Sequence, residues 1–389
     1  MSGESRRAIT ADIVFDGAVA HRNAAVIVEG GDIAGVLPPG DLPQSVSVER
    51  LPAGIWLAPG FIDVQVNGGG DVLFNDSPTP DAIRAIAAAH RHFGTTSLLP
   101  TFITDSPAKM AAAVDAAEQL IGLDPCILGI HLEGPFLSPQ KPGVHAPEYI
   151  RQPDDADVAL LTRKRKGAML VTLAPEEVPA GFVRRLTGAG IRVSLGHSMA
   201  TYEQSRAAIA EGMTGFTHLF NAMRPLASRD PGPIAAALEC PDVWFGMIVD
   251  GFHVDPAVLR IALRGLAKPM LVTDAMPPVG GTRAEFTLYG ETIRVSGGKQ
   301  CTREDGVLAG SVLDMAAAVR NCVRLIGMPL ETALRLASIH PAAFLGLDRR
   351  LGRLARGYRA DMVALDPDKI EVVRSWVAGA STIDYAAQS

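Results

Sequence analysis

The chain has 389 residues, which allows about two or three domains and a core large enough to need no disulfide bonds. Hydrophobic residues make up 48% and charged residues 20%, as in soluble globular proteins. The 36 Lys and Arg residues against 42 Asp and Glu residues give a net charge of −6, with no basic run. This balance excludes nucleic acid as the expected partner, and an anionic ligand would have to be attracted locally.

The cysteines and the N-terminal residues bear on where the protein works. Cys126, Cys240, Cys301 and Cys322 form no C-x-x-C pair, which argues against a disulfide scaffold and a cysteine-based zinc module. Residues 1–10 are polar and contain no apolar signal-peptide region. No apolar stretch approaches membrane-spanning length. We therefore expect a cytoplasmic protein without a membrane partner.

The first elements are strands, followed by alternating strands and helices. In residues 10–37, apolar and polar residues alternate in runs separated by turns, which is typical of an antiparallel sheet. From residue 55 onward, short apolar runs alternate with Ala-rich segments, and three helices with a cap residue before a proline are predicted over 82–93, 108–121 and 257–267. The eight apolar runs, each expected to form a strand, cover 61–66, 96–99, 127–132, 169–173, 191–195, 215–217, 243–249 and 270–273.

Eight strands alternating with helices predict a (β/α)8 barrel of the TIM type, a fold of roughly 250 residues. After the eighth run, the alternation returns at 286–289 and 293–295 on either side of Gly290. This pattern predicts a β-hairpin inserted near the mouth of the barrel. Two further helices are predicted over 312–326 and 330–338.

The C-terminal tail resembles the N-terminal segment, because 360–365 and 370–377 are again strand-like. Both ends of the chain therefore consist of strands, and the middle forms the barrel. The fold class we expect is α/β, with a small β-sandwich domain formed from both chain termini. The expected limits are 1–57 and 351–389 for the β-sandwich and 58–350 for the catalytic barrel, with the hairpin insertion near 284–310.

Polar residues close most of the predicted strands, at the end where catalytic groups of such barrels stand. Glu133, His197 and His218 are a carboxylate and two imidazoles on three strands, a ligand set that suits a catalytic divalent metal with one position left for water. A metal lowers the pKa of bound water from about 15.7 toward about 7, and Asp274 is then the natural general base. The residues that close these strands are Gln65, Asn67, Glu133, His197, His218, Asp250, His253 and Asp274.

Each of these residues also has a purely structural interpretation. A histidine at a strand end is commonly a hydrogen-bonded structural residue, and Glu133 could simply be ion-paired. Asp274 could be a turn residue ahead of two prolines. The occurrence of Glu133, His197, His218 and Asp274 together, at four strand ends, favours the metal site.

Several segments resemble known proteins. Residues 57–63, Leu-Ala-Pro-Gly-Phe-Ile-Asp, are similar to the first strand of the amidohydrolase superfamily. Within that superfamily, the His-Leu-Glu-Gly-Pro and His-Leu-Phe-Asn-Ala-Met motifs are similar to those of the N-acetylglucosamine-6-phosphate deacetylase family. The segments that carry this resemblance are 129–136, 173–176, 194–198, 218–223, 250–253, 272–275 and 308–311.

The resemblance implies hydrolysis of the acetamido group of N-acetylglucosamine 6-phosphate to glucosamine 6-phosphate and acetate, in amino-sugar catabolism and cell-wall sugar recycling. It implies that Glu133, His197 and His218 bind a metal that activates the attacking water. Asp274 would act as general base and acid, and His145 would polarise the amide carbonyl. It also implies a homodimer, in which one protomer supplies an arginine to the neighbouring site. The residues that match contacts to the sugar phosphate are Asn221, Ala222, His253 and Arg229, with Leu308 and Ala309 as further contacts.

One departure from the superfamily pattern concerns the metal content. Many members carry His-x-His on the first strand and hold a second metal with it, whereas this chain has Gln65 and Asn67 there. Neutral amides are weak ligands for such metals. We therefore expect one divalent metal ion per subunit. Zinc is the expected ion, and iron, cobalt and manganese are alternatives for the same ligands.

Two other functions are weighed against this one. A dihydroorotase-like or cyclic-imide hydrolase would use similar ligands, but these enzymes generally need a bridged metal pair and often a modified lysine, which 173–176 lacks. A non-enzymatic oligomeric scaffold on the same barrel would be expected to lose ligands, whereas all are present. The sequence leaves open the preferred hexosamine epimer and the use of sugars without the phosphate.

Overall fold

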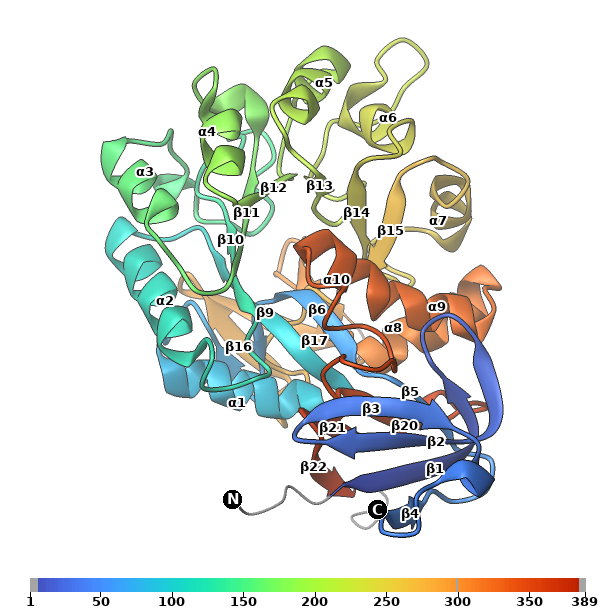
Figure 1. The fold of residues 1–389 in the computed structure, drawn as a ribbon. Coiled ribbons are helices and arrows are strands. Elements are labelled where there is room, and N and C mark those ends of the chain that lie inside the picture. Colours follow the sequence, from blue (N-terminus) through green and yellow to red (C-terminus); the bar gives the residue numbers. More distant parts are fainter. Residues whose placement is uncertain (1–5, 299, 385–389) are drawn as a thin grey trace. The chain divides into compact units, whose positions relative to one another are not determined.

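The computed structural model describes residues 6–298 and 300–384 (Figure 1). The chain forms two compact units. One holds Met1–Asp63, His90–Ser97 and Asp314–Ser389, and the other holds Val64–Ala89 and Leu98–Leu313. All residues of the predicted site belong to the second unit. The domain limits 1–57, 58–350 and 351–389 stay predictions.

Eight parallel strands form the barrel, and each overlaps one of the predicted apolar runs, so the (β/α)8 fold is confirmed. The first and last strands meet where the Asp274 N–H donates to the Gln65 carbonyl (3.0 Å) and the Asn67 N–H to the Ala275 carbonyl (2.9 Å). In sheet order the strands are β15 (Lys268–Leu271), β14 (Trp244–Met247), β13 (Gly215–Phe216), β12 (Arg192–Leu195), β11 (Ala168–Leu173), β10 (Gly129–Glu133), β9 (Thr95–Ile103) and β6 (Phe61–Val66).

A helix separates each barrel strand from the next (Figure 1). The predicted caps are confirmed: Ser106 accepts a hydrogen bond from the Lys109 N–H (3.4 Å) and Asp255 one from the Ala257 N–H (2.7 Å). The last of these helices ends before residue 267, because the chain turns near Gly265. The helices are α1 (Pro80–Arg91), α2 (Pro107–Leu120), α3 (Asp155–Thr162), α4 (Phe182–Gly188), α5 (Tyr202–Ala210), α6 (Gly232–Leu238) and α7 (Pro256–Ala262).

Strands from both chain ends form one hydrogen-bonded sheet, which confirms that the β domain is built from the two termini. Its apolar core includes Ile9, Val26, Met362 and Trp376, and Trp376 is fully buried. The sheet order is β22 (Ala380–Asp384), β21 (Glu371–Val377), β20 (Met362–Asp366), β5 (Trp56–Pro59), β1 (Arg7–Phe15), β2 (Ala20–Glu29) and β3 (Asp32–Leu37), while β4 (Ser47–Arg50) also pairs with β1.

The predicted hairpin insertion is part of a four-stranded antiparallel sheet. Apolar side chains of this sheet, such as Leu288 and Ile293, form a buried cluster with Ile103 and Met276. Ile103 ends β9 and Met276 follows β15, so this cluster attaches the sheet to the mouth of the barrel. Its strands are β16 (Glu285–Leu288), β17 (Glu291–Ser296), β18 (Gln300–Thr302) and β19 (Leu308–Ser311).

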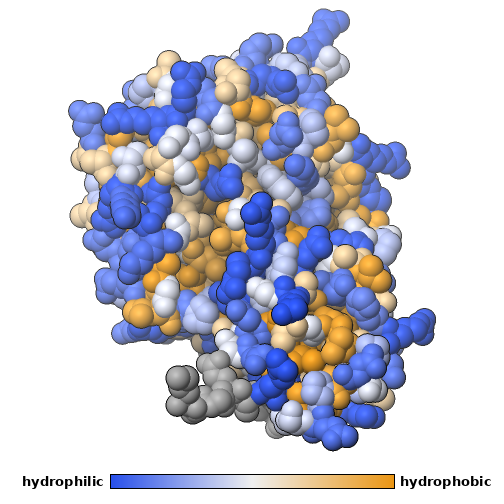
Figure 2. Space-filling model, viewed as in Figure 1, coloured by the Kyte–Doolittle hydropathy of each residue, from blue (hydrophilic) through white to orange (hydrophobic). Residues whose placement is uncertain are grey.

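None of the helices in the described residues is long and apolar enough to cross a membrane. Hydrophilic side chains are spread over much of the face shown in Figure 2.

The other elements are short. They are α8 (Met315–Asn321), a π-helical turn (Cys322–Ile326), α9 (Leu330–Leu336), α10 (Ile339–Leu345), the strand pair β7 (Gly68–Gly69) and β8 (Val72–Leu73), and 3-10 turns at Pro39–Asp41, Pro147–Tyr149 and Pro175–Glu177.

Candidate metal centre and active site

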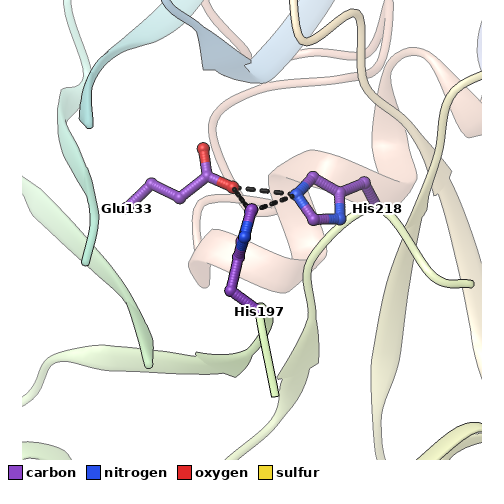
Figure 3. A group of neighbouring side chains, drawn as sticks. All are labelled: Glu133, His197 and His218. Carbon is purple, nitrogen blue, oxygen red and sulfur yellow. Dashed lines mark hydrogen bonds and ion pairs between the residues drawn. The ribbon is translucent and has the colours of Figure 1, made fainter. Parts of the chain in front are cut away.

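Glu133, His197 and His218 converge at the mouth of the barrel (Figure 3). Glu133 Oε1 lies 2.8 Å from His218 Nε2 and 3.2 Å from His197 Nε2, and the two imidazole nitrogens are 3.2 Å apart. Donor atoms around a tetrahedral zinc ion are separated by about 3.3 Å. All three residues are at most 5% exposed. The two nitrogens and one carboxylate oxygen therefore match the donor set of a divalent metal ion.

The backbone at these strand ends is strained. His197, His218 and Asp274 have φ values of 47°, 32° and 53°, in the left-handed region that ordinary residues seldom adopt. Such positions cost about 1–3 kcal/mol each and tend to gather at functional sites. Here the left-handed residue comes just after its strand, where the chain leaves the barrel wall.

The loop after β12 is fixed by two hydrogen bonds that orient His197. The His197 Nδ1–H donates to the Lys141 carbonyl (2.9 Å), which turns the Nε2 edge of the ring toward Glu133 and His218. The next residue, Ser198, donates its hydroxyl to Glu176 Oε2 (2.7 Å). Burial raises the pKa of Glu176. This carboxylate, placed just after β11, thus holds the loop that carries a candidate ligand.

The charges of the site influence one another strongly. Burial alone would raise the pKa of Glu133, but hydrogen bonds and charge from His197 and His218 hold it well below its usual range. Burial and the negative charge of Glu133 raise the pKa of Asp274 to about 6. Burial lowers the pKa of His145 well below its usual range, so this imidazole is neutral. A carboxyl group with a pKa near neutrality is suited to proton transfer.

Two side-chain amides from the first strand hold Asp274. The Gln65 and Asn67 amides both donate to Asp274 Oδ1, at 3.2 and 2.6 Å, and Gln65 also donates to Glu133 Oε2 at 3.1 Å. Among the described residues, both of these hydrogen bonds to Asp274 go to the same carboxylate oxygen. The other oxygen, Oδ2, is therefore the one suited to take a proton.

His145 is only 4% exposed, although its loop position alone would suggest a solvated residue. Its ring centre lies 4.4 Å from that of His197. The Thr104 N–H donates to His145 Nδ1 (3.4 Å), which assigns the ring proton to Nε2, and the Thr104 hydroxyl lies 2.8 Å from the same nitrogen. The Tyr289 hydroxyl, from the turn between β16 and β17, donates to the Thr104 carbonyl.

A pocket of about 360 Å³ opens beside the candidate ligands, within the usual range for small-molecule sites. Leu308 and Gly310 of the inserted sheet line it, whereas Ala309 between them packs into the buried cluster. The predicted site residues that line the pocket are Asn67, Glu133, His145, His197, His218, Asn221, Ala222, His253, Asp274 and Leu308. Gln65 is linked to this group by its hydrogen bonds.

Arg229 stands apart from the other predicted residues. It is exposed on the loop between β13 and α6 and is not among the described residues that line the pocket. Its neighbour Asp230 is ion-paired with Arg224 (2.7 Å). Within this chain, Arg229 does not line the pocket to which its sequence match assigns it.

Three residues of the site were missed by sequence reasoning. Thr104 follows β9, but the second apolar run was expected to stop at residue 99, because Pro100 and Thr101 interrupt its pattern. Glu176 follows β11, and the rule that strand ends carry function would have found it. Tyr289 lies in a turn, where neither the alternation of apolar residues nor a sequence motif indicates a functional residue.

Comparisons with known proteins agree on one family. The model of the amidohydrolase family matches residues 56–388. An N-acetylgalactosamine-6-phosphate deacetylase of Shewanella sp. (strain ANA-3) is 44% identical over 85% of this chain and 84% of its own length. An N-acetylglucosamine-6-phosphate deacetylase of Haemophilus influenzae is 36% identical over 89% of this chain and 92% of its own. The crystal structure of N-acetylglucosamine-6-phosphate deacetylase from Pasteurella multocida has a TM-score of 0.94 and 34% identity, covering 97% of this chain and 100% of its own. The chain belongs to the amidohydrolase family and, within it, to the N-acetylglucosamine-6-phosphate deacetylase family.

Proposed function

We propose that this protein hydrolyses the acetamido group of N-acetylglucosamine 6-phosphate, giving glucosamine 6-phosphate and acetate. The observation that carries the proposal is the convergence of Glu133, His197 and His218 in the pocket that also holds Asp274 and His145. Relatives that match most of this chain have names that include this activity. Such a reaction would serve amino-sugar catabolism and cell-wall sugar recycling in the cytoplasm.

Glu133, His197 and His218 would hold one divalent metal ion per subunit. Bound there, such an ion supplies Lewis acidity, which lowers the pKa of a water from about 15.7 toward about 7 and polarises a carbonyl. Zinc is the ion expected for two imidazoles and one carboxylate, and iron, cobalt and manganese accept the same ligands. Gln65 and Asn67 are weak metal ligands and already donate to carboxylates, which supports a single ion.

In the proposed mechanism, Asp274 moves one proton. It takes a proton from the attacking water as the water oxygen adds to the amide carbon. It then delivers that proton to the sugar nitrogen as the C–N bond breaks. His145 donates its Nε2 proton in a hydrogen bond to the carbonyl oxygen, where negative charge develops. The hydrogen bonds to Asp274 Oδ1 and His145 Nδ1 support these roles, because they fix which atom faces the reaction.

The other end of the pocket would bind the sugar phosphate through Asn221, the Ala222 backbone and His253, with Leu308 on the inserted sheet. The contact expected from Ala309 stays a prediction, because its side chain is buried in the cluster of that sheet. Arg229 is exposed. We therefore assign Arg229 to the active site of the second subunit of a homodimer, where its planar guanidinium would bind the phosphate. Net charge alone does not attract the substrate to a protein of charge −6.

Mixing two inactive variants tests the role of Arg229. Asp274→Asn and Arg229→Met protomers are purified separately, then mixed and allowed to exchange subunits. If Arg229 serves the neighbouring site, the hybrid dimer has one complete site and about a quarter of the wild-type activity returns at equal mixing. Recovery of no activity, with hybrid dimers present, would show that Arg229 acts within its own protomer. Full activity of Arg229→Met alone would show that Arg229 plays no part.

An acetate-release assay tests the function itself. Metal-defined protein is given the 6-phosphates of N-acetylglucosamine, N-acetylgalactosamine and N-acetylmannosamine, and each sugar without its phosphate. We expect turnover of N-acetylglucosamine 6-phosphate that a chelator abolishes, which also excludes a non-enzymatic scaffold. Failure on all the sugar phosphates would overturn the proposal and favour another amide or cyclic-imide hydrolase.

The galactose epimer is the second candidate substrate. The Shewanella relative, at 44% identity, has N-acetylgalactosamine 6-phosphate in its name. The two sugars differ at one stereocentre, so the same ligands and the same base would serve both. The ratio of kcat/KM for the two epimers in the assay above decides between them.

A further inference from the structure

The loop after β14 contains a carboxylate–imidazole pair that the proposed mechanism does not use. Asp250 Oδ2 lies 2.6 Å from His253 Nδ1. The other carboxylate oxygen, Oδ1, accepts hydrogen bonds from the backbone N–H groups of Phe252 (2.8 Å) and His253 (2.9 Å). The side chains of His253 and Asp250 are 6% and 7% exposed. Asp250 therefore fixes both the turn and the ring.

The proton positions in this pair follow from the charge of Asp250. Burial would raise the pKa of Asp250, but the hydrogen bond and charge of His253 and the two backbone N–H groups lower it. Asp250 is thus a carboxylate, which can only accept hydrogen bonds, so His253 Nδ1 must carry a proton. His253 lines the pocket, whereas Asp250 is not among the described lining residues. The edge of the ring that is left for a ligand is therefore the Nε2 edge.

The hydrogen bond to Asp250 fixes the orientation of the His253 ring. Because Asp250 engages Nδ1 at 2.6 Å, the Nε2 edge is the one that can face a ligand in the pocket. The pair forms within the loop after β14, so the ring is oriented before a ligand binds. A side chain held in this way loses less conformational entropy on binding than a freely rotating one.

We propose that Asp250 is a positioning residue for phosphate recognition, which holds His253 with its Nε2 edge directed to the phosphate of the bound sugar. This inference rests on the proposed function, because it takes the ligand to be an amino-sugar phosphate. Asp250 itself touches no part of the substrate. It acts through His253, and it does so within one protomer, independently of Arg229.

The two oxygens of Asp250 allow its two roles to be separated. In Asp250→Asn, the remaining oxygen can still accept from the Phe252 and His253 N–H groups, so the turn is retained. The new amide group carries no charge and cannot accept from Nδ1. Asp255 provides the matched control, because it lies on the same loop and caps α7 through the Ala257 N–H (2.7 Å), whereas the carboxylate bonded to the His253 ring is that of Asp250.

The test compares the affinities of metal-loaded proteins for glucosamine 6-phosphate and for glucosamine. The dissociation constants are measured by calorimetry or by ligand-observed NMR. We expect Asp250→Asn to weaken binding of glucosamine 6-phosphate about tenfold and to leave glucosamine within about twofold of wild type. His253→Gln should cause a similar selective loss, and the double variant should lose little more, because both changes remove one interaction. Asp255→Asn should bind both sugars as wild type does.

An equal loss for both sugars would overturn the proposal, since His253 would then contact the sugar ring or the loop would have moved. Unchanged affinity for the phosphorylated sugar would overturn it as well. These outcomes do not depend on turnover. A wild-type protein that binds glucosamine 6-phosphate but releases no acetate would overturn the proposed function, while the comparison of the variants would still decide the role of Asp250.

Discussion

Two groups of polar side chains lie next to each other at the mouth of the barrel, and they differ in kind. Glu133, His197 and His218, at the ends of β10, β12 and β13, bring three ligand atoms within 4.8 Å of one another. Gln65 on β6 and Asn67 just beyond it bring amide groups whose N–H bonds are already directed at carboxylates. The first group is therefore suited to bind a cation, and the amides of the second group are suited to donate hydrogen bonds to the nearby carboxylates.

The difference concerns what holds the base in place. A second cation at the first strand would attract Asp274 by charge, whereas amides attract it by directed hydrogen bonds. Gln65 and Asn67 both bind Oδ1, which distinguishes the two oxygens of the carboxylate. We infer that the amide pair orients the base and that the ligand group holds the metal. The following predictions test this division.

The largest effect is expected from Asp274→Asn. Removal of the base should lower kcat at least about 1000-fold, because proton transfer to and from the substrate is lost. The bound metal and the affinity for glucosamine 6-phosphate should stay close to those of wild type, since Asp274 is a base and not a ligand in this division. Turnover is measured by acetate release. Loss of the metal along with activity would contradict the division.

The pH dependence should follow the protonation of Asp274. Burial and the charge of Glu133 raise the pKa of Asp274 to about 6, and a nearby metal cation would favour the carboxylate and lower this pKa. The base acts only when unprotonated. We therefore expect kcat/KM to fall about tenfold per pH unit below this pKa and to level off above about pH 6. A profile that falls between about pH 5 and 7 as the pH rises would be incompatible with Asp274 as the base.

A smaller effect is expected from Asn67→Ala. This change removes the 2.6 Å bond to Asp274 and leaves the bond from Gln65. Hydrogen bonds to charged groups contribute about 1.5–3 kcal/mol, so kcat should fall about 10- to 150-fold, with KM unchanged. Metal analysis of the same preparation serves as the control and should match wild type. If KM changed while kcat did not, Asn67 would contact the substrate instead of the base.

The smallest effect is expected from Tyr289→Phe, which removes the hydroxyl that donates to the Thr104 carbonyl. Thr104 in turn contacts His145, so a less ordered Thr104 should lower kcat about threefold. Tyr202→Phe is the matched control, because its hydroxyl donates to Glu239 on the outer helices. Equal losses of kcat in the two variants would show that removal of either hydroxyl acts through general stability. Tyr289 would then have no role in positioning His145.

The strand periodicity predicted the barrel, and the strand-end rule predicted that Glu133, His197 and His218 would lie together. This worked because parallel strands in a closed barrel direct their carboxyl ends to one mouth, so Glu133, His197 and His218 had to be neighbours. Thr104 was missed because Pro100 breaks the apolar pattern inside β9, which hid the true end of that strand. Sequence patterns therefore predict the residues of a site only where they place the ends of the strands correctly.

Other features depend on the completed fold or on a second chain. The left-handed backbone of His197 and His218 has no signal in the sequence, since the residue type disfavours it and only the surrounding structure imposes it. The bonds from Gln65 and Asn67 to Asp274 join residues about 200 positions apart. The role proposed for Arg229 would depend on a partner subunit, which one sequence does not define.

A metal titration tests the division between ligand and amide groups most directly. The metal is removed with a chelator, zinc is returned stepwise, and both bound zinc and acetate release from N-acetylglucosamine 6-phosphate are measured at each step. A site with one ion predicts that activity rises in proportion to bound zinc and stops rising at one ion per chain. Activity that continues to rise until two ions are bound per chain would contradict it.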